Sequence, residues 1–386
     1  MKIIQILCHS LNNDSTRDYH VWGNWSARLA RNIVSNTNKY QCEVWYAIKD
    51  LDKKIEFKKQ DIRFKLYPAK SIHKAVESYF PLVDCPLLFD DLRMENLDST
   101  IIHFQGERGS LLHKVLKDFP NFKITIQYHG YGQPPWLEWF EGLFITPLER
   151  KTFKNASHFF VNIKPRLEYL RKKVFIPANK ISYQNVGIDF KLFKPRNKMS
   201  ARRKLGLPLK SFIILHIGNL SAEKGVDKII NAYINLKKKY PQLFLLFIGA
   251  RPDHPLYKIA KDNADKLIGN ILYQDLPLYY NAADVYCYYG NNKNKRYQGL
   301  GTAPTEALAS NLNVVSTNLI HFPDKIVNKT GFIPKNFQDF MNKIEFLIMR
   351  PEFKFNPRKI VAPYTDYKYQ TAHLLNVYDK LLTKKN

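Results

Sequence analysis

The stretch DVYCYYGNNKNKRYQGLGTAPTEALASNLNVVST, residues 284–317, decides the fold of this chain. It predicts a strand, a loop punctuated by glycines, a helix that opens near Pro304, and a second strand. Gly299 and Gly301 let the backbone approach a ligand closely, and Thr302 can cap the helix. A proline in the first turn of a helix costs no hydrogen bond. Because free amide N–H groups at a helix start attract anions, the segment predicts a phosphate site.

Glu306 lies one turn inside the predicted helix. This position is too near the phosphate end for us to expect a buried core residue. A carboxylate there can accept two hydrogen bonds from vicinal hydroxyls, such as those of a ribose. First-turn acids also commonly complement the helix dipole, and on this residue alone the two interpretations carry equal weight.

Length and composition indicate two domains. A chain of 386 residues with 45% apolar and 14% aromatic residues suits two cores of roughly 150–200 residues each. The four cysteines have no C-x-x-C spacing, so we expect reduced core residues in a cytoplasmic chain. The start, MKIIQILCHS, predicts a first strand rather than a signal peptide. No run approaches the roughly 18 apolar residues that span a bilayer.

The net charge of +26 is the unusual bulk property. Nucleic acid, an anionic membrane surface or phosphorylated substrates would all be attracted by it, and solubility with a lysine-rich composition is the alternative explanation. Residues 150–173 concentrate the charge, with basic residues interleaved with aromatic ones. This pattern suits an anionic membrane interface, although part of the span, HFFVN, predicts a buried strand.

Alternating strands and helices run along both halves of the chain. In the first half we expect a helix at 20–36 and strands at 2–8, 42–48, 62–66, 101–106 and 123–130. In the second half we expect strands at 212–218, 243–249, 271–275, 284–290 and 313–317. This alternation is typical of an α/β protein with two doubly wound parallel sheets.

The 284–317 segment resembles the donor-binding element of the retaining glycosyltransferases of family 4, which have the two-domain GT-B fold. In that family two glutamates bracket the glycine loop, and the corresponding residues here are Gln298 and Glu306. The resemblance implies that Gln298 touches hydroxyls of the donor sugar and that Glu306 holds the ribose. An amide can still donate and accept hydrogen bonds. It cannot carry the negative charge that would stabilise a developing oxocarbenium ion.

The resemblance also covers the interdomain hinge. The matching hinge residues are Asn185, Gly187, Asp189, Phe193 and Pro195. It implies Rossmann-like domains at 1–190, on the acceptor side, and at 196–364, on the nucleotide-sugar side, with an interdomain cleft. A closing helix at about 365–386 would return to the first domain.

The run GNLSAEKG, residues 218–225, resembles the family's diphosphate-binding loop. In the family a basic residue follows the first glycine, and a lysine precedes the last one. Lys224 matches the second cation, whereas Asn219 replaces the first, after Gly218. Three basic residues are candidates to supply the missing charge: Lys293, Lys295 and Arg296. Taken alone, Lys224 could also be an exposed lysine at a helix start.

His129 ends a predicted buried strand, at the edge where parallel sheets place ligands. By resemblance its imidazole or backbone contacts the transferring sugar near the primary hydroxyl, although a lone histidine is more often a satisfied core residue. His103 fits that structural alternative better. Asp18 and His20 lie where the family carries a glycine pair, and we assign them to the acceptor side.

The resemblance therefore implies a retaining, metal-independent transferase without a cofactor. It would move a hexose from a nucleotide-diphosphate sugar to a lipid-linked, glycan or polysaccharide acceptor, in the cytoplasm, either free or peripheral at the inner face of the membrane. His129 and Lys224 are the expected catalytic residues. The expected donor-binding residues are Gly218, Asn219, Lys224, Gln298, Gly299, Leu300, Gly301, Thr302 and Glu306.

Two alternatives remain open at this point. The departures at Asn219 and Gln298 favour a nucleotide-sugar-binding subunit that has lost turnover. The high positive charge favours a nucleic-acid-binding protein on the same fold, although we expect no nucleic-acid partner. The base, the sugar, the acceptor and the oligomeric state are not determined by the sequence.

Overall fold

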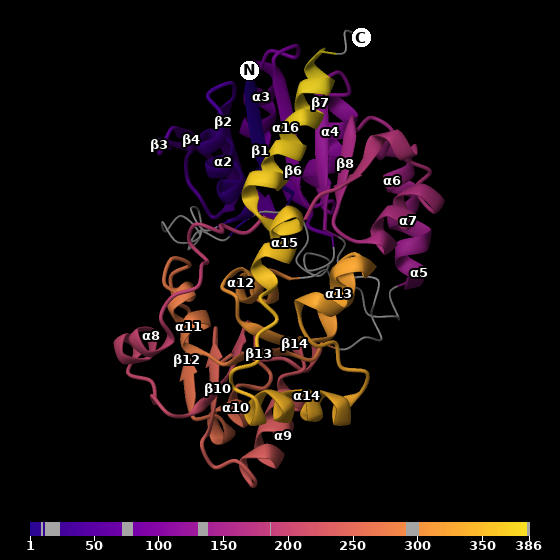
Figure 1. The fold of residues 1–386 in the computed structure, drawn as a ribbon. Coiled ribbons are helices and arrows are strands. Elements are labelled where there is room, and N and C mark those ends of the chain that lie inside the picture. Colours follow the sequence, from indigo (N-terminus) through magenta and orange to yellow (C-terminus); the bar gives the residue numbers. More distant parts are fainter. Residues whose placement is uncertain are drawn as a thin grey trace. The chain divides into compact units, whose positions relative to one another are not determined.

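The computed structural model describes residues 1–8, 11, 24–71, 80–129, 138–185, 187–290 and 301–383. Contacts divide the chain into two compact units, drawn in Figure 1. The first unit comprises Met1–Asn185 and Gln370–Asn386, and the second comprises Val186–Tyr369. The change of unit, between Asn185 and Val186, lies within the hinge motif, and the return to the first unit occurs inside the last helix.

The first unit is built on a mainly parallel sheet. Its parallel strands are, in spatial order, β4 (Ile62–Ser71), β2 (Gln41–Lys49), β1 (Lys2–Leu7), β6 (Thr100–Gln105), β7 (Lys123–Tyr128), β8 (His158–Val161) and β9 (Ile181–Tyr183). Two antiparallel strands, β3 (Ile55–Lys59) and β5 (Val83–Asp84), flank β4. The central strands are apolar without alternation because the sheet is covered on both faces. The five strands predicted for this half are confirmed.

Helices cover the two faces of this sheet (Figure 1). They are α2 (Trp25–Asn36), α3 (Pro86–Arg93), α4 (Ser110–Asp118), α5 (Glu138–Phe140), the π-helical turn Glu141–Ile145, α6 (Thr146–Phe153), α7 (Lys164–Lys172) and α16 (Tyr367–Thr383). The predicted helix at 20–36 begins at Trp25 in the described residues, where the Asn24 side chain accepts the Ser26 N–H at 3.2 Å. From Gln370 onward α16 belongs to the first unit, and its Tyr378 hydroxyl lies 2.7 Å from Nδ1 of His103.

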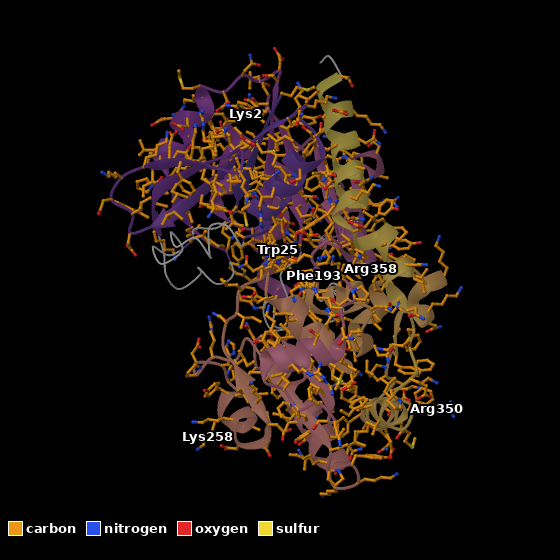
Figure 2. All side chains as sticks on the ribbon, turned by 60° about the vertical axis from the view of Figure 1, so that its left-hand side comes forward. Lys2, Trp25, Phe193, Lys258, Arg350 and Arg358 are labelled. Carbon is orange, nitrogen blue, oxygen red and sulfur yellow. The ribbon has the colours of Figure 1, made fainter. Side chains whose placement is uncertain are left out.

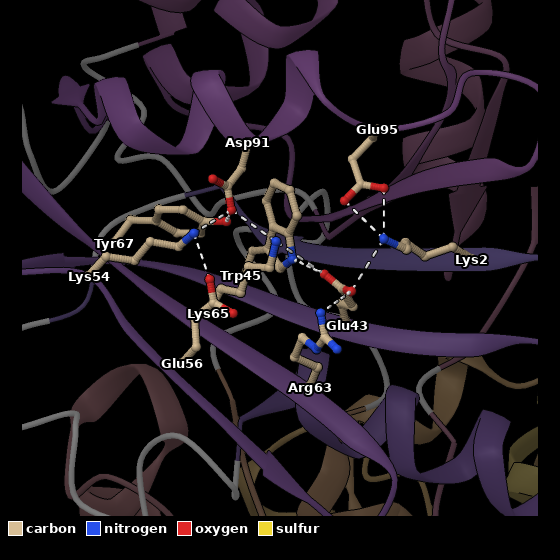
Figure 3. Close-up of polar contacts among 10 residues, drawn as sticks. All are labelled: Lys2, Glu43, Trp45, Lys54, Glu56, Arg63, Lys65, Tyr67, Asp91 and Glu95. Carbon is tan, nitrogen blue, oxygen red and sulfur yellow. Dashed lines mark hydrogen bonds and ion pairs between the residues drawn. The ribbon is translucent and has the colours of Figure 1, made fainter.

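A polar network extends from the amino ends of β1 and β2 to the middle of β4 in the first unit (Figure 3). Asp91 of α3 accepts hydrogen bonds from Lys54 at 2.7 Å, Lys65 at 2.9 Å and the Tyr67 hydroxyl at 2.8 Å. Glu43 of β2 is buried and accepts the Trp45 indole N–H at 2.8 Å. Ligands of open parallel sheets bind at the carboxyl ends of the strands, so we interpret this network as structural.

The second unit has a fully parallel sheet in the order β12-β11-β10-β13-β14. The strands are β10 (Phe212–Ile217), β11 (Leu243–Ile248), β12 (Lys266–Ile268), β13 (Val285–Tyr288) and β14 (Asn313–Ser316). Its helices are α8 (Lys198–Leu205), α9 (Val226–Lys237), α10 (Tyr257–Asn263), α11 (Leu276–Ala282), α12 (Thr302–Ala309), α13 (Asp324–Thr330), α14 (Phe337–Met349) and α15 (Pro357–Thr365). Separate apolar clusters lie on the two faces of the sheet. The strand order reverses between β10 and β13, which makes that point the switch of a doubly wound sheet.

Arg358 of α15 ties together distant segments of the second unit. Its guanidinium donates to the carbonyl oxygens of Phe193, Ala309 and Phe190, the last at 2.6 Å. Figure 2 shows Arg358 beside Phe193. The same side chain therefore holds both the start of the unit and the carboxyl end of α12.

One strand prediction was wrong. Residues 271–275 form no strand; they lead by a turn into α11, and Leu272 is 50% exposed. The edge strand is instead β12, whose Lys266–Ile268 backbone pairs with β11. The apolar start of ILYQD resembles a strand, but the shorter run KLI, residues 266–268, pairs with β11 at that edge of the sheet. The short strands β3 and β5 were not predicted, because they lie in a stretch without clear periodicity.

The four cysteines, Cys8, Cys42, Cys85 and Cys287, are free and buried, as expected for core residues. Burial raises the pKa of Cys42 and Cys85 to about 12, so these thiols stay protonated.

Candidate functional site

The switch point of the second unit brings two loops to one edge of the sheet. One loop, 218–225, follows β10, and the other follows β13. The two loops touch, because a Cβ placed on Gly225 would lie only 1.8 Å from the carbonyl oxygen of Tyr289. Gly225 also has a positive φ of 72°, so a glycine is required there both for backbone conformation and for space.

Gly218 begins the first loop with a φ of 143°. Its N–H donates to the Ile248 carbonyl at 2.9 Å, and its own carbonyl packs against Gly249. Asn219 follows with an exposed side chain, at the position where the family resemblance implied a cation. Backbone contacts therefore hold the start of the loop at Gly218, and the side chain of Asn219 is exposed to solvent.

Lys224 lies at the end of the same loop. The residue is exposed, yet its Nζ lies 5.8 Å from the centroid of the Tyr288 ring at the end of β13. The pKa of its ammonium group is lowered, because desolvation outweighs the attraction of Glu223. Lys224 forms no ion pair within the part of the chain that the structure describes. An incoming anion would stabilise the charged form of this ammonium group, because it supplies a nearby opposite charge that offsets the desolvation.

The start of α12 differs from the prediction at Thr302. Gly301 is the N-cap residue, with φ 77° and ψ 153°, and no side chain in the described ranges caps the helix. Thr302 is already the first helical residue, because the positive φ of Gly301 turns the chain one residue earlier than expected. The Thr305 hydroxyl instead donates to the Gly301 carbonyl at 2.7 Å. The first amides of the helix therefore receive no cap from the side chains that the structure describes, which suits an external anion.

Glu306 is buried, with only 3% of its surface exposed, contrary to the expectation that it could not be a core position. Its Oε2 accepts the Tyr280 hydroxyl of α11 at 2.8 Å. Pro304 through Ala309 are all buried, because α12 is a hydrophobic helix packed against α11 and α15. Burial, together with the Glu306 charge, raises the pKa of Tyr280 well above its usual value, so the phenol remains a donor. Tyr280 belongs to this site, although no sequence pattern indicated it.

Several predicted residues lie outside the described ranges. They are Asp18, His20, Lys293, Lys295, Arg296, Gln298, Gly299 and Leu300. The described part of the predicted donor pocket therefore consists of Gly218, Asn219, Lys224, Gly301, Thr302 and Glu306. All six lie in the second unit, on the two loops at the switch point or on α12.

His216, near the end of β10, also went unselected. It is buried between the rings of Tyr286 and Tyr288, and its Nδ1 lies 3.0 Å from the Cys287 carbonyl. Its Nε2 has no hydrogen-bond partner within the described residues. Burial lowers its pKa to about 4, so the imidazole is neutral at pH 7. The only signal was one polar residue inside the apolar run FIILHIG, which more often indicates a core histidine.

His129 lies in the first unit, directly after β7. Its backbone N–H donates to Oε2 of Glu107 at 2.9 Å, and its Nε2 lies 3.3 Å from Oε1 of Gln105. The Trp25 ring meets its edge, with ring centroids 5.4 Å apart. His129 is thus held at the carboxyl ends of β6 and β7. Gln105 and Glu107 were missed, although polar residues at the carboxyl end of a buried strand and in the loop that follows it are a usable signal.

His103 is a structural residue, in agreement with the sequence analysis. It is fully buried, its Nδ1 lies 2.9 Å from the Thr125 hydroxyl, and burial lowers its pKa to about 3. No group of three or more His, Cys, Asp or Glu side chains suited to a metal ion occurs among the described residues. None of the helices in the described ranges is long and apolar enough to cross a bilayer.

Comparison with known proteins finds a family model that matches part of the second unit and solved structures that share the fold. Residues 197–360, most of the second unit, match the family model described as Glycosyl transferases group 1. In structure, the chain resembles sucrose-phosphate synthase from Thermosynechococcus elongatus, with a TM-score of 0.73, 18% identity and 99% of each chain covered. It also resembles Anabaena HepE solved with UDP, with a TM-score of 0.68, 15% identity and 98% and 100% of the two chains covered. The fold is therefore GT-B, with two Rossmann-like domains.

Curated relatives share only part of their length with the chain. An uncharacterized glycosyltransferase of Haemophilus influenzae is 27% identical over 41% of this chain and 43% of its own length. Alpha-monoglucosyldiacylglycerol synthase of Acholeplasma laidlawii is 30% identical over 29% and 28%, respectively. The lipopolysaccharide core mannosyltransferase LpsB of Rhizobium meliloti is 29% identical over 38% and 44%. The chain thus aligns with less than half the length of these relatives.

Proposed function

We propose that the protein is a retaining glycosyltransferase that moves a hexose from a nucleotide-diphosphate sugar to a lipid-linked, glycan or polysaccharide acceptor. The observation that carries the proposal is the switch point of the second unit, where the Lys224 loop and the uncapped start of α12 lie in the segment matching the group 1 transferases. Both features suit a diphosphate, because one offers a cation and the other offers free amides.

In this proposal Lys224 neutralises the diphosphate. A leaving diphosphate gains negative charge in the transition state, and a nearby ammonium stabilises that charge. Asn219 contributes no charge, so the proposal keeps Lys293, Lys295 and Arg296 as sources of a second cation. Of the two cations expected to bind the diphosphate, the described residues contain only Lys224.

Glu306 is proposed to accept hydrogen bonds from the ribose hydroxyls. The Tyr280 hydroxyl orients its carboxylate at 2.8 Å, and burial keeps competing water away. A buried carboxylate that binds vicinal hydroxyls needs such an orienting partner, since a free rotamer would weaken a bidentate contact. Gln298 is proposed to contact the sugar, and His129 is proposed to contact its primary hydroxyl.

The proposed chemistry is a front-face substitution. The acceptor oxygen forms a bond to the anomeric carbon on the side from which the diphosphate leaves, and the bond from that carbon to the phosphate oxygen breaks. The acceptor proton passes to the departing phosphate oxygen. No protein nucleophile and no metal are needed in this scheme, and the configuration at the anomeric carbon is retained.

The relatives suggest the acceptor class. The Acholeplasma and Rhizobium proteins are named for work on a glycolipid and on lipopolysaccharide core. We therefore favour a lipid-linked acceptor and a cytoplasmic location at the inner face of the membrane.

The first test is a thermal-shift screen of the purified protein with UDP, GDP and ADP. We expect one nucleotide to raise the melting temperature and Glu306→Ala to abolish the shift. Incubation with the matching nucleotide sugar and lipid extracts should then release the nucleoside diphosphate. A chain that none of the three nucleotides stabilises would contradict the proposal.

A second candidate function is a donor-binding subunit without turnover. The exposed, neutral Asn219 favours it, since the leaving group lacks one of its expected cations. Nucleotide binding without transfer or hydrolysis would support this candidate. Restored or increased turnover in Asn219→Arg would show that the missing charge limits the reaction.

A further inference from the structure

The helical run that precedes and includes α6 displays large apolar side chains to solvent. Trp139 is 60% exposed, Leu143 is 65% exposed and Phe144 is 56% exposed. The ring of Phe140 lies 5.0 Å from that of Phe144 and 6.0 Å from that of Trp139. We call these four residues the apolar turn. Single exposed apolar residues are ordinary on a protein surface, but a group of adjacent ones marks an interaction site.

The apolar turn is held firmly from its inner side. Glu141, inside the same π-helical turn, is buried and accepts a hydrogen bond from the Arg108 guanidinium at 2.7 Å. Ile145, at the end of the turn, is also buried. Because this inner face is anchored in the first unit, the apolar side chains on the outer face are displayed by a fixed helix.

Next to this run lies a basic pocket between α4 and α6. It has a volume of about 650 Å³, and Phe80 and Leu148 provide apolar lining. Its charged lining residues are Lys114, Lys117, Lys151 and Lys154, with Asp118 as the single acid. All four lysines are exposed, and none forms an ion pair with the described residues. We call this site the lysine pocket.

Hydrogen bonds between α4 and the end of α6 fix the walls of the lysine pocket. Asn155 Nδ2 donates to the Leu116 carbonyl at 2.9 Å. Nδ1 of the buried His113 lies 2.7 Å from the Thr152 hydroxyl, which itself donates to the Leu148 carbonyl at 2.9 Å. The pocket is therefore formed before any ligand arrives, which lowers the entropic cost of binding.

The apolar turn and the lysine pocket lie on one continuous helical run, 138–153. Leu148, Lys151 and Asn155 line the pocket at helical spacing, and Phe144 precedes Leu148 by one turn. More positive charge follows nearby, where the Arg150 guanidinium lies 4.7 Å from the ring of Phe175, which is 65% exposed. Apolar and aromatic side chains beside lysines are the composition of a helix that lies in a membrane interface.

We propose that the apolar turn and the lysine pocket together form a docking surface for an anionic phospholipid bilayer. The lysine pocket receives a lipid phosphate, and Trp139, Leu143 and Phe144 enter the acyl boundary. This inference rests on the membrane location in the proposed function and assigns it to particular residues, but it does not require glycosyl transfer. Single-stranded nucleic acid fits less well, because it stacks on several rings spread along a basic groove. Among the lining residues of the lysine pocket Phe80 provides one phenyl ring, and the exposed rings of Trp139 and Phe144 are not part of the lining.

The test is co-sedimentation of the full chain with vesicles of phosphatidylcholine, with and without phosphatidylglycerol. We expect binding to the anionic vesicles, since each lysine near such a surface contributes about 1 kcal/mol. Lys151→Gln/Lys154→Gln removes two lysines and should therefore weaken that binding about 30-fold. The matched control is Lys258→Gln/Lys261→Gln on α10, where both lysines are exposed and the same charge is removed. The control should bind the vesicles as the unaltered chain does.

The apolar half is tested with Trp139→Ser/Phe144→Ser. Its control is Ile259→Ser/Leu272→Ser, which replaces residues that are 48% and 50% exposed in the second unit. We expect only the first pair to reduce vesicle binding and to abolish the blue shift of tryptophan fluorescence on vesicles. Equal vesicle binding by all variants, or equal losses in test and control pairs, would overturn the docking surface.

Two further arms separate the alternatives. If inorganic phosphate displaces the protein from vesicles at low concentration, or a single-stranded oligonucleotide does so, the pocket is an anion or nucleic-acid site and the inference fails. Nucleotide thermal shift, measured on every variant, reports folding and the proposed donor site separately. Loss of vesicle binding with an intact nucleotide shift supports the docking surface, whereas vesicle binding without any nucleotide shift refutes only the transferase proposal.

Discussion

At the scale of single residues, Lys224 is the group whose charge the proposed donor site uses most directly. Lys224→Ala is expected to weaken nucleoside diphosphate binding by about 10-fold to 100-fold, since hydrogen bonds to charged groups contribute about 1.5–3 kcal/mol. Lys224→Arg is the control that keeps the charge. Because the pKa of Lys224 is lowered, its affinity for the anion should fall as pH rises toward 10.5, and this fall should be absent in Lys224→Ala. Isothermal titration at several pH values measures both effects, and a pH-independent affinity would contradict the assignment.

Gly225 is a second residue with a sharp expectation. Gly225→Ala places a Cβ 1.8 Å from the Tyr289 carbonyl in a backbone with positive φ. The matched control is Gly206→Ala, since Gly206 has a φ of 60° and open space around it. The control should cost about 1–2 kcal/mol of unfolding free energy for conformation alone. Gly225→Ala should cost more and should also remove nucleotide binding, because the two site loops must separate. Urea denaturation of both variants, with and without each nucleotide, measures their unfolding free energies and nucleotide binding. Similar losses of unfolding free energy in the two variants would show that the two loops can separate without cost.

At the scale of elements, the network around Asp91 holds α3 to the sheet of the first unit (Figure 3). Hydrogen bonds from Lys54, Lys65 and Tyr67 outweigh desolvation and lower the pKa of Asp91 below its ordinary value of 3.8. A lowered folded-state pKa means that the carboxylate stabilises the fold above pH 3.8, and that this contribution is lost as pH falls through the lower value. Asp91→Asn should cost about 1–2 kcal/mol at pH 7, because the network is partly solvated. The difference from the unaltered chain should shrink in acid; a constant difference would rule out the charge as its source.

In the second unit, Arg358 connects elements by hydrogen bonds. It joins α15 to the end of α12 and to the start of the unit. Arg358→Ala leaves three carbonyl acceptors without this donor and should cost about 2–4 kcal/mol. The control is Arg350→Ala, an exposed arginine at the end of α14 that is also labelled in Figure 2. We expect a lower melting temperature and weaker nucleotide binding only for Arg358→Ala, since α12 carries Glu306. Equal melting temperatures would show that backbone packing alone holds α12.

At the scale of the whole molecule, the chain closes the first unit with its last helix. Leu374 and Tyr378 of α16 are fully buried in the core of that unit. Removal of residues 370–386 should therefore expose apolar surface on the first unit and cause aggregation or early melting there. Nucleotide binding by the second unit should survive. Limited proteolysis with and without the nucleotide distinguishes the units, and an unchanged first unit would contradict this role of α16.

Much of the fold was predictable because its signals are local. Strands of a parallel sheet are buried on both faces, so they appear in the sequence as continuous apolar runs such as 2–8 and 243–249. The error at 271–275 arose where two short runs competed for one sheet edge, since pairing with β11 depends on partners outside the window. Thr302 was misassigned for a similar reason, because capping depends on the φ of Gly301 rather than on the presence of a hydroxyl.

The sequence by itself determined the alternation of strands and helices, the positions of the glycine loops and the basic character of the surface, since periodicity and composition act over a few residues. Only the tertiary structure decided that Glu306 is buried against Tyr280, that Gln105 and Glu107 hold His129, and that lysines of α4 and α6 share one pocket. These partners are far apart in the chain or on different elements. Packing brings them together, and neither propensity nor spacing contains that information.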